Sequence, residues 1–237
     1  MSRKGKRRQR WIVLGVLICC ALVLGTAILP MSVSAERVSD HYIRYGVSET
    51  AALNLVSAVL LDYRSFDTLG EATVIFAAVS AVSVLMSGGG LSRNRRTLSN
   101  LARCAVANIY PVLWLFPLYV ILHGHLSPGG GFHGGVTMGV LLIMISVLYG
   151  TAFSLPKLSL TALSYTEYSS ALAFILVGLA GVVHGSGFLS NIGAGFFKGS
   201  PGDLVSAGFL PLLNVIIGFK VAAGLVSIYY QLLRSGD

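Results

Sequence analysis

The sequence predicts an all-α polytopic membrane protein with about six transmembrane helices. Of its 237 residues, 54% are hydrophobic and only 11% are charged, and the mean hydropathy is +0.77. Soluble domains carry roughly a quarter charged residues, so this composition excludes an ordinary soluble protein. Several apolar runs approach or exceed the roughly 20 residues that a helix needs to cross a bilayer. Basic residues gather mainly at positions 3–10 and 93–103, a distribution typical of cytoplasmic segments that fix orientation.

Six apolar segments are predicted to cross the membrane. They cover residues 11–29, 66–86, 106–122, 132–155, 168–188 and 207–233. A stretch rich in glycine and arginine separates the first two from the last four. This predicts a two-helix module (1–90), a basic cytoplasmic linker (91–104) and a four-helix domain (105–237). The first segment also fits a signal peptide, but its apolar run is longer than that of a typical signal peptide, so we favour a retained helix.

The distribution of charge predicts a multi-pass protein of the cytoplasmic membrane whose N- and C-termini both lie in the cytoplasm. In that orientation the basic linker, Lys157 and Arg234 fall on the cytoplasmic side. The loops at residues 31–48 and 189–206 then fall outside. Because the basic segments satisfy the positive-inside rule together, an even number of spans before the linker is favoured.

The chain between the first two predicted helices changes character twice. Residues 35–49 are polar and are expected to form an external loop, whereas residues 50–61 are apolar but too short to span, which indicates an interfacial helix. A polar stretch then leads into the second predicted helix. Within it, Asp67 and Glu71 are four residues apart and would share one helix face near the N-terminus, where negative charge is favoured. The simplest interpretation is a capped helix start at the membrane surface.

The stretch from Leu122 to Gly139 is predicted to be a glycine-rich broken-helix element. Pro128 removes a backbone donor and disfavours helix before it, and the glycines that follow permit conformations closed to other residues. The glycines and proline concerned are Pro128, Gly129, Gly130, Gly131, Gly134 and Gly135. Gly131, Gly135 and Gly139 recur every fourth residue, so a helix that resumes there would present a bare ridge to a neighbouring helix.

Lys220 is the most conspicuous charge inside an apolar segment. It lies near the middle of the last predicted helix, where its side chain cannot easily reach either membrane surface. Small neighbours such as Ala223 and Gly224 suit tight packing, so the ammonium is expected to face protein or a wet cavity. Two interpretations remain open: a buried lysine that exchanges protons, or a static charge partner for a carboxylate of a neighbouring subunit.

Three of the five histidines flank the glycine-rich element. His123, His125 and His133 could in principle hold a metal, but no carboxylate or cysteine lies in that stretch, so we predict no metal site and prefer a hydrated proton or cation path. His184, near the outer end of the fifth predicted helix, is either a packing residue or a member of such a path. Glu167 opens that helix and is interpreted as a helix N-terminal charge.

Several function classes lack support in the sequence. The net charge of +8 is concentrated in two clusters that fit membrane orientation, so we predict no nucleic-acid partner. The three cysteines lack metal-ligand spacing and are expected to form no disulfide. We find no nucleotide-binding loop, no hydrolase nucleophile motif and no zinc-protease motif, and we predict no cofactor and no enzymatic activity.

Two motifs carry a resemblance to a known family. The run from His123 to Phe132, followed by Gly134 and Gly135, resembles the signature of the B-type subunit of the Mrp-type multisubunit sodium/proton antiporters, and of the related component in membrane-bound hydrogenases. The segment from Asn214 to Gly224 resembles the last helix of that family. This resemblance covers roughly Asn108 to the C-terminus.

The first module carries a second resemblance. Residues 54–71 are similar to a short two-helix unit at the C-terminal end of the antiporter's large A-type subunit, which hydrogenase-type complexes carry as a separate small protein. The chain thus resembles a fusion of two adjacent antiporter-module subunits. His133 and Ser65 depart from the family pattern and leave the ion and the polarity of coupling open.

The resemblance implies a part of a large membrane complex that exchanges sodium for protons or couples redox chemistry to ion pumping. The implied partners are the lipid bilayer, Na⁺, H⁺ and the A-, C-, D-, E-, F- and G-type subunits of the antiporter module. We expect an ion or proton path at a subunit interface, formed by Asp67, Glu71, His123, His125, Lys220 and His184. A structural subunit that only docks its neighbours is the rival hypothesis. A self-sufficient carrier is disfavoured because the chain shows no inverted repeat.

Overall fold

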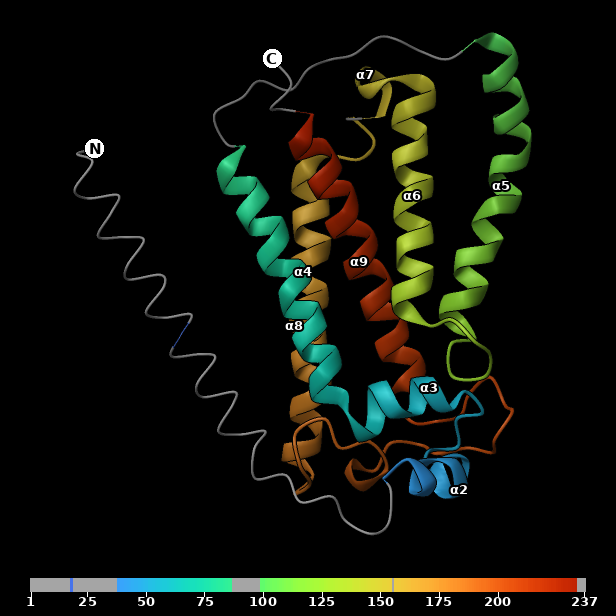
Figure 1. The fold of residues 1–237 in the computed structure, drawn as a ribbon, viewed down its shortest axis with the longest axis vertical. Coiled ribbons are helices and arrows are strands. Elements are labelled where there is room, and N and C mark those ends of the chain that lie inside the picture. The colour runs from blue at the N-terminus through green and yellow to red at the C-terminus, as the bar shows by residue number, and fades with distance from the viewer. Residues whose placement is uncertain (1–17, 19–37, 87–98, 155, 234–237) are drawn as a thin grey trace, which may run out of the picture. The chain divides into compact units, whose positions relative to one another are not determined.

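The described residues of the computed structural model are 18, 38–86, 99–154 and 156–233 (Figure 1). The chain divides into two compact units, Met1–Asp40 and His41–Asp237, and the fold below concerns the second. The predicted first helix, apart from Ile18, lies outside the described residues. So do most of the basic linker and Arg234.

All the regular structure in the described part of the chain is helical. The five helices long and apolar enough to cross a membrane are α4 (Ser65–Leu85), α5 (Asn100–Leu122), α6 (Gly131–Tyr149), α8 (Leu160–Val183) and α9 (Leu210–Leu232). The shorter elements are α2 (Val38–Thr50), α3 (Leu55–Ala58), the π-helix η1 (Val59–Tyr63), α7 (Thr151–Ser154) and the 3₁₀ helix η2 (Ile192–Ala194). The predicted polytopic all-α membrane fold is confirmed.

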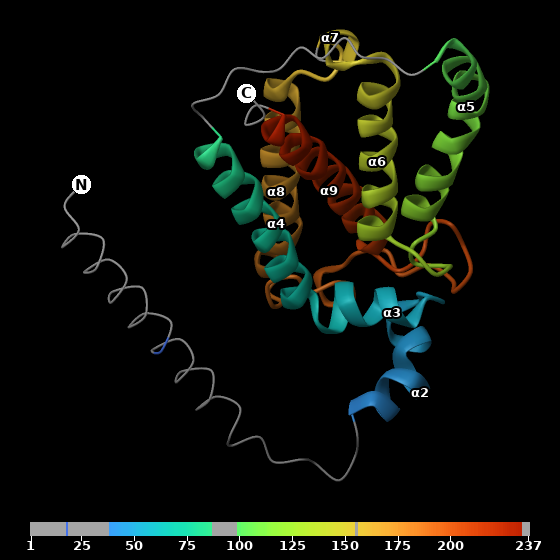
Figure 2. The same ribbon diagram turned by 45° about the horizontal axis from the view of Figure 1, so that its top comes forward.

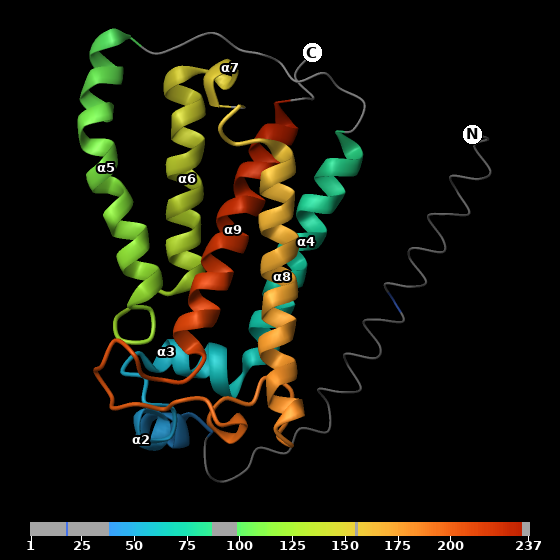
Figure 3. The same cartoon turned by 180° about the vertical axis from the view of Figure 1, so that it is seen from behind.

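Helix α9 lies at the centre of the long helices. It packs against α6, α8, α4 and α5, and it is the most buried of the five candidate spans. Figures 1 and 3 show α4 and α8 on one side of α9 and α6 on the other, with α5 beyond α6. Figure 2 shows α3 running across one end of the long helices, whereas α7 lies at the other end. We call these the α3 end and the α7 end.

Two expectations about the segment before α4 differ from the structure. Residues 35–49, expected as a loop, include most of α2, because their polar side chains can remain solvated on a helix that does not span the membrane. Residues 50–61, expected as one interfacial helix, hold the short helix α3 and the start of η1. Asn54 caps α3 by accepting hydrogen bonds from the backbone of Val56 and Ser57.

The predicted glycine ridge of α6 is confirmed, and it faces α9. A Cβ atom on Gly131 would lie 2.4 Å from the carbonyl oxygen of Asn214, and one on Gly135 would lie 2.6 Å from that of Gly218. Gly134 faces α5, where a Cβ would meet the Ile121 side chain at 2.4 Å. Backbone contacts this short exclude any larger side chain, so the glycines set the distance between α6 and its neighbours.

The glycine-rich element itself is an ordered reversal between two antiparallel helices. The helix breaks after Leu122 and resumes at Gly131, with Gly129 (φ 143°) and Gly130 (φ 102°) in conformations that favour glycine. The Asn54 side-chain amide donates hydrogen bonds to the carbonyls of Gly124 (2.8 Å) and Ser127 (2.9 Å). The connection is therefore clamped to the start of α3.

His125 lies inside this clamped connection and is fully buried. Its backbone carbonyl accepts a hydrogen bond from the backbone N–H of Asn54 at 3.0 Å. Neither ring nitrogen has a hydrogen-bond partner in the described part of the chain. Burial lowers the pKa of His125 below its ordinary value, and the nearby backbone of Asp203 and Leu204 partly opposes this effect. The structure therefore favours the neutral imidazole.

Replacing Gly135 by alanine should destabilise the protein. The new methyl group would press on the Gly218 carbonyl and on Val221, and overpacking of this kind costs roughly 1–3 kcal/mol. The thermal unfolding midpoint of the detergent-purified protein measures the effect. Gly70→Ala is the matched control, because a Cβ on Gly70 of α4 meets nothing within 4 Å. Equal midpoints for the two variants would contradict this account of α6–α9 packing.

Acidification should weaken the fold through His125. The folded-state pKa lies below the unfolded value, so the unfolded chain binds more protons in the interval between them. Stability is then full above a pH of about 6.5 and falls as the pH drops from there toward the folded-state pKa. Unfolding midpoints measured from pH 8 to pH 5 should fall less steeply for His125→Gln than for the wild type. His133→Gln removes an exposed histidine and should keep the wild-type slope.

Candidate functional site

The ammonium of Lys220 is buried and faces a carboxylate of its own chain. Only 2% of the residue is exposed, and its Nζ atom lies 4.0 Å from Oε1 of Glu167 on α8. Glu167 is equally buried. Of the two interpretations left open for Lys220, the one with a carboxylate on a neighbouring subunit is corrected, since Glu167 lies one helix away in the same chain.

Glu167 was missed because the start of its helix was misplaced. The structure begins α8 at Leu160, where Ser159 caps it by accepting a hydrogen bond from the Ala162 amide at 3.1 Å. Glu167 therefore lies two turns inside the helix and is not an N-terminal charge. The serines and threonines before it resemble a loop in sequence, but their hydroxyls bond the helix backbone, as Thr166 does to Ala162, or face a cavity.

An aromatic pair lies beside the ion pair. The Lys220 ammonium is 5.5 Å from the ring centroid of Phe76 on α4, within the range of a cation–π interaction. The Phe76 ring in turn contacts Tyr168 edge to face, with centroids 5.9 Å apart. The charge of Lys220 is thus compensated by a carboxylate on one helix and an aromatic face on another.

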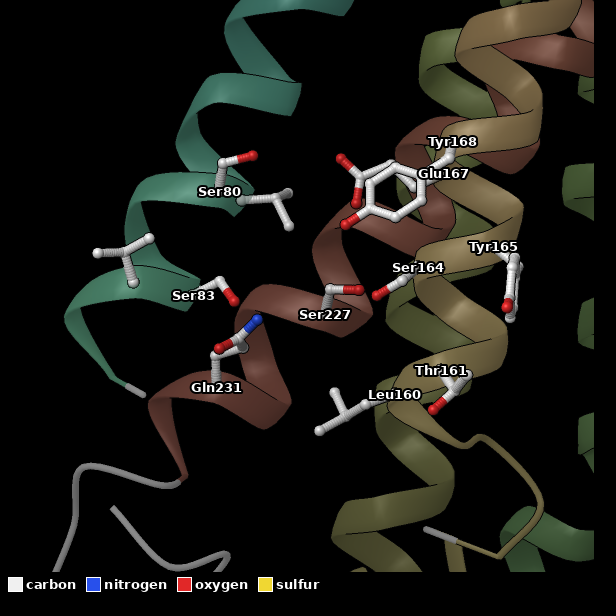
Figure 4. Close-up of a pocket in the computed structure, with 12 residues that line it drawn as sticks. Ser80, Ser83, Leu160, Thr161, Ser164, Tyr165, Glu167, Tyr168, Ser227 and Gln231 are labelled. Carbon is white, nitrogen blue, oxygen red and sulfur yellow. The ribbon is translucent and has the colours of Figure 1, made fainter. Parts of the chain in front are cut away.

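A cavity of about 600 Å³ between α4, α8 and α9 reaches Glu167. We call it the hydroxyl cavity. Figure 4 shows the hydroxyl groups of Ser80 and Ser83 on one wall and those of Ser164 and Ser227 on the other walls. Gln231 also lines the cavity, whereas Lys220 is not among the lining residues. Glu167 therefore stands between the cavity and the lysine.

Several buried polar atoms around the cavity have no hydrogen-bond partner in the described part of the chain. They are Oε1 of Glu167, Nζ of Lys220, Oγ of Ser227 and Oε1 of Gln231. The 4.0 Å separation within the ion pair is too long for a direct hydrogen bond. Buried polar groups without protein partners are the usual sites of ordered water, and this cavity is polar and large enough to hold several molecules.

This arrangement can hold a proton at either of two positions. A buried carboxylate and ammonium form an ion pair, and transfer of one proton converts them to a neutral acid and amine. Charges are costly in a low-dielectric interior, which favours the transfer. Water in the hydroxyl cavity would give a proton a route to or from Glu167. The geometry thus fits proton exchange as well as static charge compensation.

The two acidic residues predicted on α4 lie near the α3 end and are exposed. Asp67 forms an exposed ion pair with Arg64, whose Nη2 is 2.6 Å from Oδ2. Glu71 is one turn further along the same helix. Neither Asp67 nor Glu71 lines the hydroxyl cavity that reaches the Glu167–Lys220 pair.

The predicted histidines also lie away from the hydroxyl cavity. His123 stacks on Tyr119, with ring centroids 4.2 Å apart, and His125 is buried in the α5–α6 connection. His184 ends α8, where its Nδ1 lies 2.8 Å from the carbonyl oxygen of Ala180. Among the described residues, no group of three His, Cys, Asp or Glu side chains could hold a metal ion.

A second polar cluster, which the sequence did not reveal, lies at the α3 end. Tyr63 donates a hydrogen bond to Glu49, which lowers the pKa of that carboxyl. Burial, and then this hydrogen bond, raise the pKa of Tyr63. Asp62 accepts a 2.9 Å hydrogen bond from Asn191, and burial raises its pKa. These residues line a pocket of about 390 Å³. They come from segments more than a hundred residues apart, so no local motif marks them.

Comparison with known proteins places both parts of the sequence. Residues 101–227 match the family described as the domain related to the MnhB subunit of Na⁺/H⁺ antiporter. Residues 6–100 match the MbhE family, which is described as the E-type subunit of MBH. An uncharacterized protein of Methanocaldococcus jannaschii is 33% identical over 197 residues, which are 73% of this chain and 74% of the relative.

Two solved structures share the fold. One chain of the membrane-bound sulfane sulfur reductase, an archaeal respiratory membrane complex, matches 96% of this chain over 98% of its own length, with a TM-score of 0.71 and 30% identity. A chain of the Mrp complex from Dietzia sp. DQ12-45-1b matches 98% of this chain over 26% of its own length, with a TM-score of 0.67; at 22% identity this likeness concerns the fold alone. The protein is therefore a multi-pass membrane protein that belongs to the family of the domain related to the MnhB subunit of Na⁺/H⁺ antiporter.

Proposed function

We propose that the chain is a membrane subunit of a multisubunit cation/proton antiporter complex, and that Glu167 and Lys220 form part of its proton path. The observation that carries this proposal is the buried pair at the inner end of the hydroxyl cavity. Membership of the MnhB-related family supports the antiporter assignment. An intramembrane charge pair next to a water-accessible cavity is a common element of proton relays.

The finer assignments follow from charge and family. We propose Na⁺ as the exchanged cation, A-, C-, D-, E-, F- and G-type subunits as partners, and the cytoplasmic membrane as the location. Lys157 follows α7, and the basic residues at positions 93–103 come just before and in the first turn of α5, which starts at the α7 end. The positive-inside rule therefore favours that end as the cytoplasmic side. The hydroxyl cavity then opens toward the cytoplasm.

The residues at the α3 end have a separate place in this proposal. Asp67, Glu71, His123 and His184 would lie near the external surface, where they can border an entrance or contact a neighbouring subunit. His125 would support this region through the connection it is buried in. None of the five needs to touch the Glu167–Lys220 pair for the proposal to hold.

A redox-driven ion-pumping complex is the second candidate. The observation that favours it is the match along nearly the whole chain to one chain of a respiratory membrane complex, at 30% identity. In such a complex the same buried pair would serve as a proton site in the membrane arm. The two candidates differ in what drives transport, while the role of this chain is the same.

Removing one charge of the pair should impair both assembly and exchange, whereas removing both should impair exchange alone. Glu167→Gln or Lys220→Met leaves an uncompensated buried charge, which costs roughly 3–5 kcal/mol, but the double variant leaves none. Sodium-dependent proton movement in vesicles containing the whole complex measures exchange, and a native gel measures assembly. Lys157→Met, which removes an exposed lysine, is the matched control.

The double variant decides between a path and a scaffold. An assembled complex that has lost exchange supports a place for the pair on the proton path. An assembled complex with wild-type exchange refutes it. The same assays on Glu71→Gln test the exposed carboxylate, whose loss should leave assembly intact if it borders the path and should release a neighbouring protein of the complex if it is a docking residue.

A further inference from the structure

The hydroxyl cavity follows the three helices inward from the α7 end. On α4 its lining runs from Val84 back to Val79, on α8 from Leu160 to Tyr168, and on α9 from Gln231 back to Ser227. The longest of these runs covers eight residue steps, or about 12 Å of helix. Each run begins near the helix terminus at the α7 end, so the cavity reaches that end of the bundle. Its side chains, drawn in Figure 4, include Tyr165 and Tyr168, which are 71% and 55% exposed, so the flank of the cavity is open as well.

The inner end of the cavity coincides with the ion pair. Glu167 and Tyr168 are the deepest lining residues on α8, and the Phe76 ring that contacts Tyr168 also faces the Lys220 ammonium. Phe76 is not itself a lining residue. The aromatic contact therefore marks where the lined space stops on the α4 side.

Apolar side chains fill the bundle beyond the pair. Ile216 and Ile217 lie one turn from Lys220 toward the α3 end, and Phe174 lies two turns beyond Glu167 on α8. All three belong to a buried apolar cluster that extends to Leu213 and Leu210. In that cluster Ile217, Leu213 and Phe174 are at most 2% exposed, so tightly packed apolar side chains lie on the α3 side of the pair.

We propose that the hydroxyl cavity is a water-filled half-channel for small cations that meets the aqueous phase at the α7 end only and ends at Glu167, its exposed flank facing lipid or a neighbouring protein of the complex. This inference deepens the proposed function and rests on it for the identity of the moving ion. It specifies from which end of the bundle ions reach the pair and where the cavity stops. A proton that reaches the pair through this cavity must therefore leave the same way, unless the apolar cluster or the Phe76–Tyr168 contact rearranges.

The chemistry of the walls selects cations. The carboxylate that lines the cavity is that of Glu167, at the inner end, and the walls offer hydroxyl and amide oxygens. Lys220 lies behind Glu167. Oε1 of Glu167 and Oγ of Ser227 have no hydrogen-bond partner in the described part of the chain, so both have unused acceptor capacity.

Cysteine accessibility tests the proposal without measuring transport. In a background where Cys19, Cys20 and Cys104 are serine, Ser83→Cys and Ser164→Cys report on the walls formed by α4 and α8. Ser170→Cys is the matched control, since it is the same substitution on the same helix, one turn beyond Glu167 and 8% exposed. The probe is a membrane-impermeant, positively charged thiosulfonate, added to either face of vesicles that contain the whole complex.

Two exposed positions mark the faces of the membrane. Lys157→Cys reports the α7 end, and Asp203→Cys reports the α3 end. We expect the two wall cysteines to be labelled from the face that labels Lys157→Cys and not from the other face, and Ser170→Cys to be labelled from neither. A negatively charged probe of the same size should react with Ser164→Cys at roughly a third of the rate or less, because the nearby carboxylate repels it.

Three results would overturn the half-channel. They are labelling of the wall cysteines from both faces or from neither, labelling of Ser170→Cys as fast as Ser164→Cys, and equal rates for the two probes. The outcome is separable from the proposed function. The expected labelling pattern together with normal exchange in the Glu167→Gln/Lys220→Met variant would keep the half-channel and refute the proton path, and the converse results would do the opposite.

Discussion

The burial of Lys220 in the central helix is the constraint on which the rest of the bundle depends. An ammonium that is 2% exposed costs several kcal/mol unless a counter-charge lies beside it. That requirement sets the position of α8 along α9, because Glu167 must reach the level of the lysine. It also brings α4 to the same level, where the Phe76 ring faces the ammonium. The helices on this side of α9 are therefore positioned by a charge as well as by apolar contact.

The opposite side of α9 is fixed by the absence of side chains. Gly131 and Gly135 allow the backbone of α6 to approach carbonyl groups of α9 at distances that no other residue permits. Helix α9 is thus held on one face by the Lys220–Glu167 ion pair and on the other by the glycine contacts with α6. A shift or rotation of α9 would disturb one or the other. The hydroxyl cavity lies on the α4 and α8 side of α9. Serine side chains on its walls are too small to fill the space between these helices.

The local sequence pattern predicted most of the long helices and the glycine ridge. It did not predict the polar contacts between residues far apart in the chain. Apolar length and charge parity gave the spans of α4, α5, α6 and α9, and the fourfold glycine spacing predicted the α6 ridge. The sequence places the start of α8 too late, because the serines and threonines of its first two turns are typical of a loop. In the structure some of these hydroxyl groups face the hydroxyl cavity. The sequence therefore favours a helix N-terminal charge at Glu167. Its pairing with Lys220, like that of Asp62 with Asn191, joins residues too far apart for any spacing rule.

The exposure of each charged group separates the two roles that a membrane protein can have within a complex. A group that binds a neighbouring protein must reach the surface, as Asp67 and Glu71 do. Glu167 and Lys220 do not reach it, so they cannot serve as contacts between neighbours in this arrangement of helices. Nor do they add much stability, since a buried ion pair is often no more stable than apolar residues of the same volume. We infer that a pair that neither docks a neighbour nor strengthens the core, yet borders a polar cavity, is present for the proton it can hold.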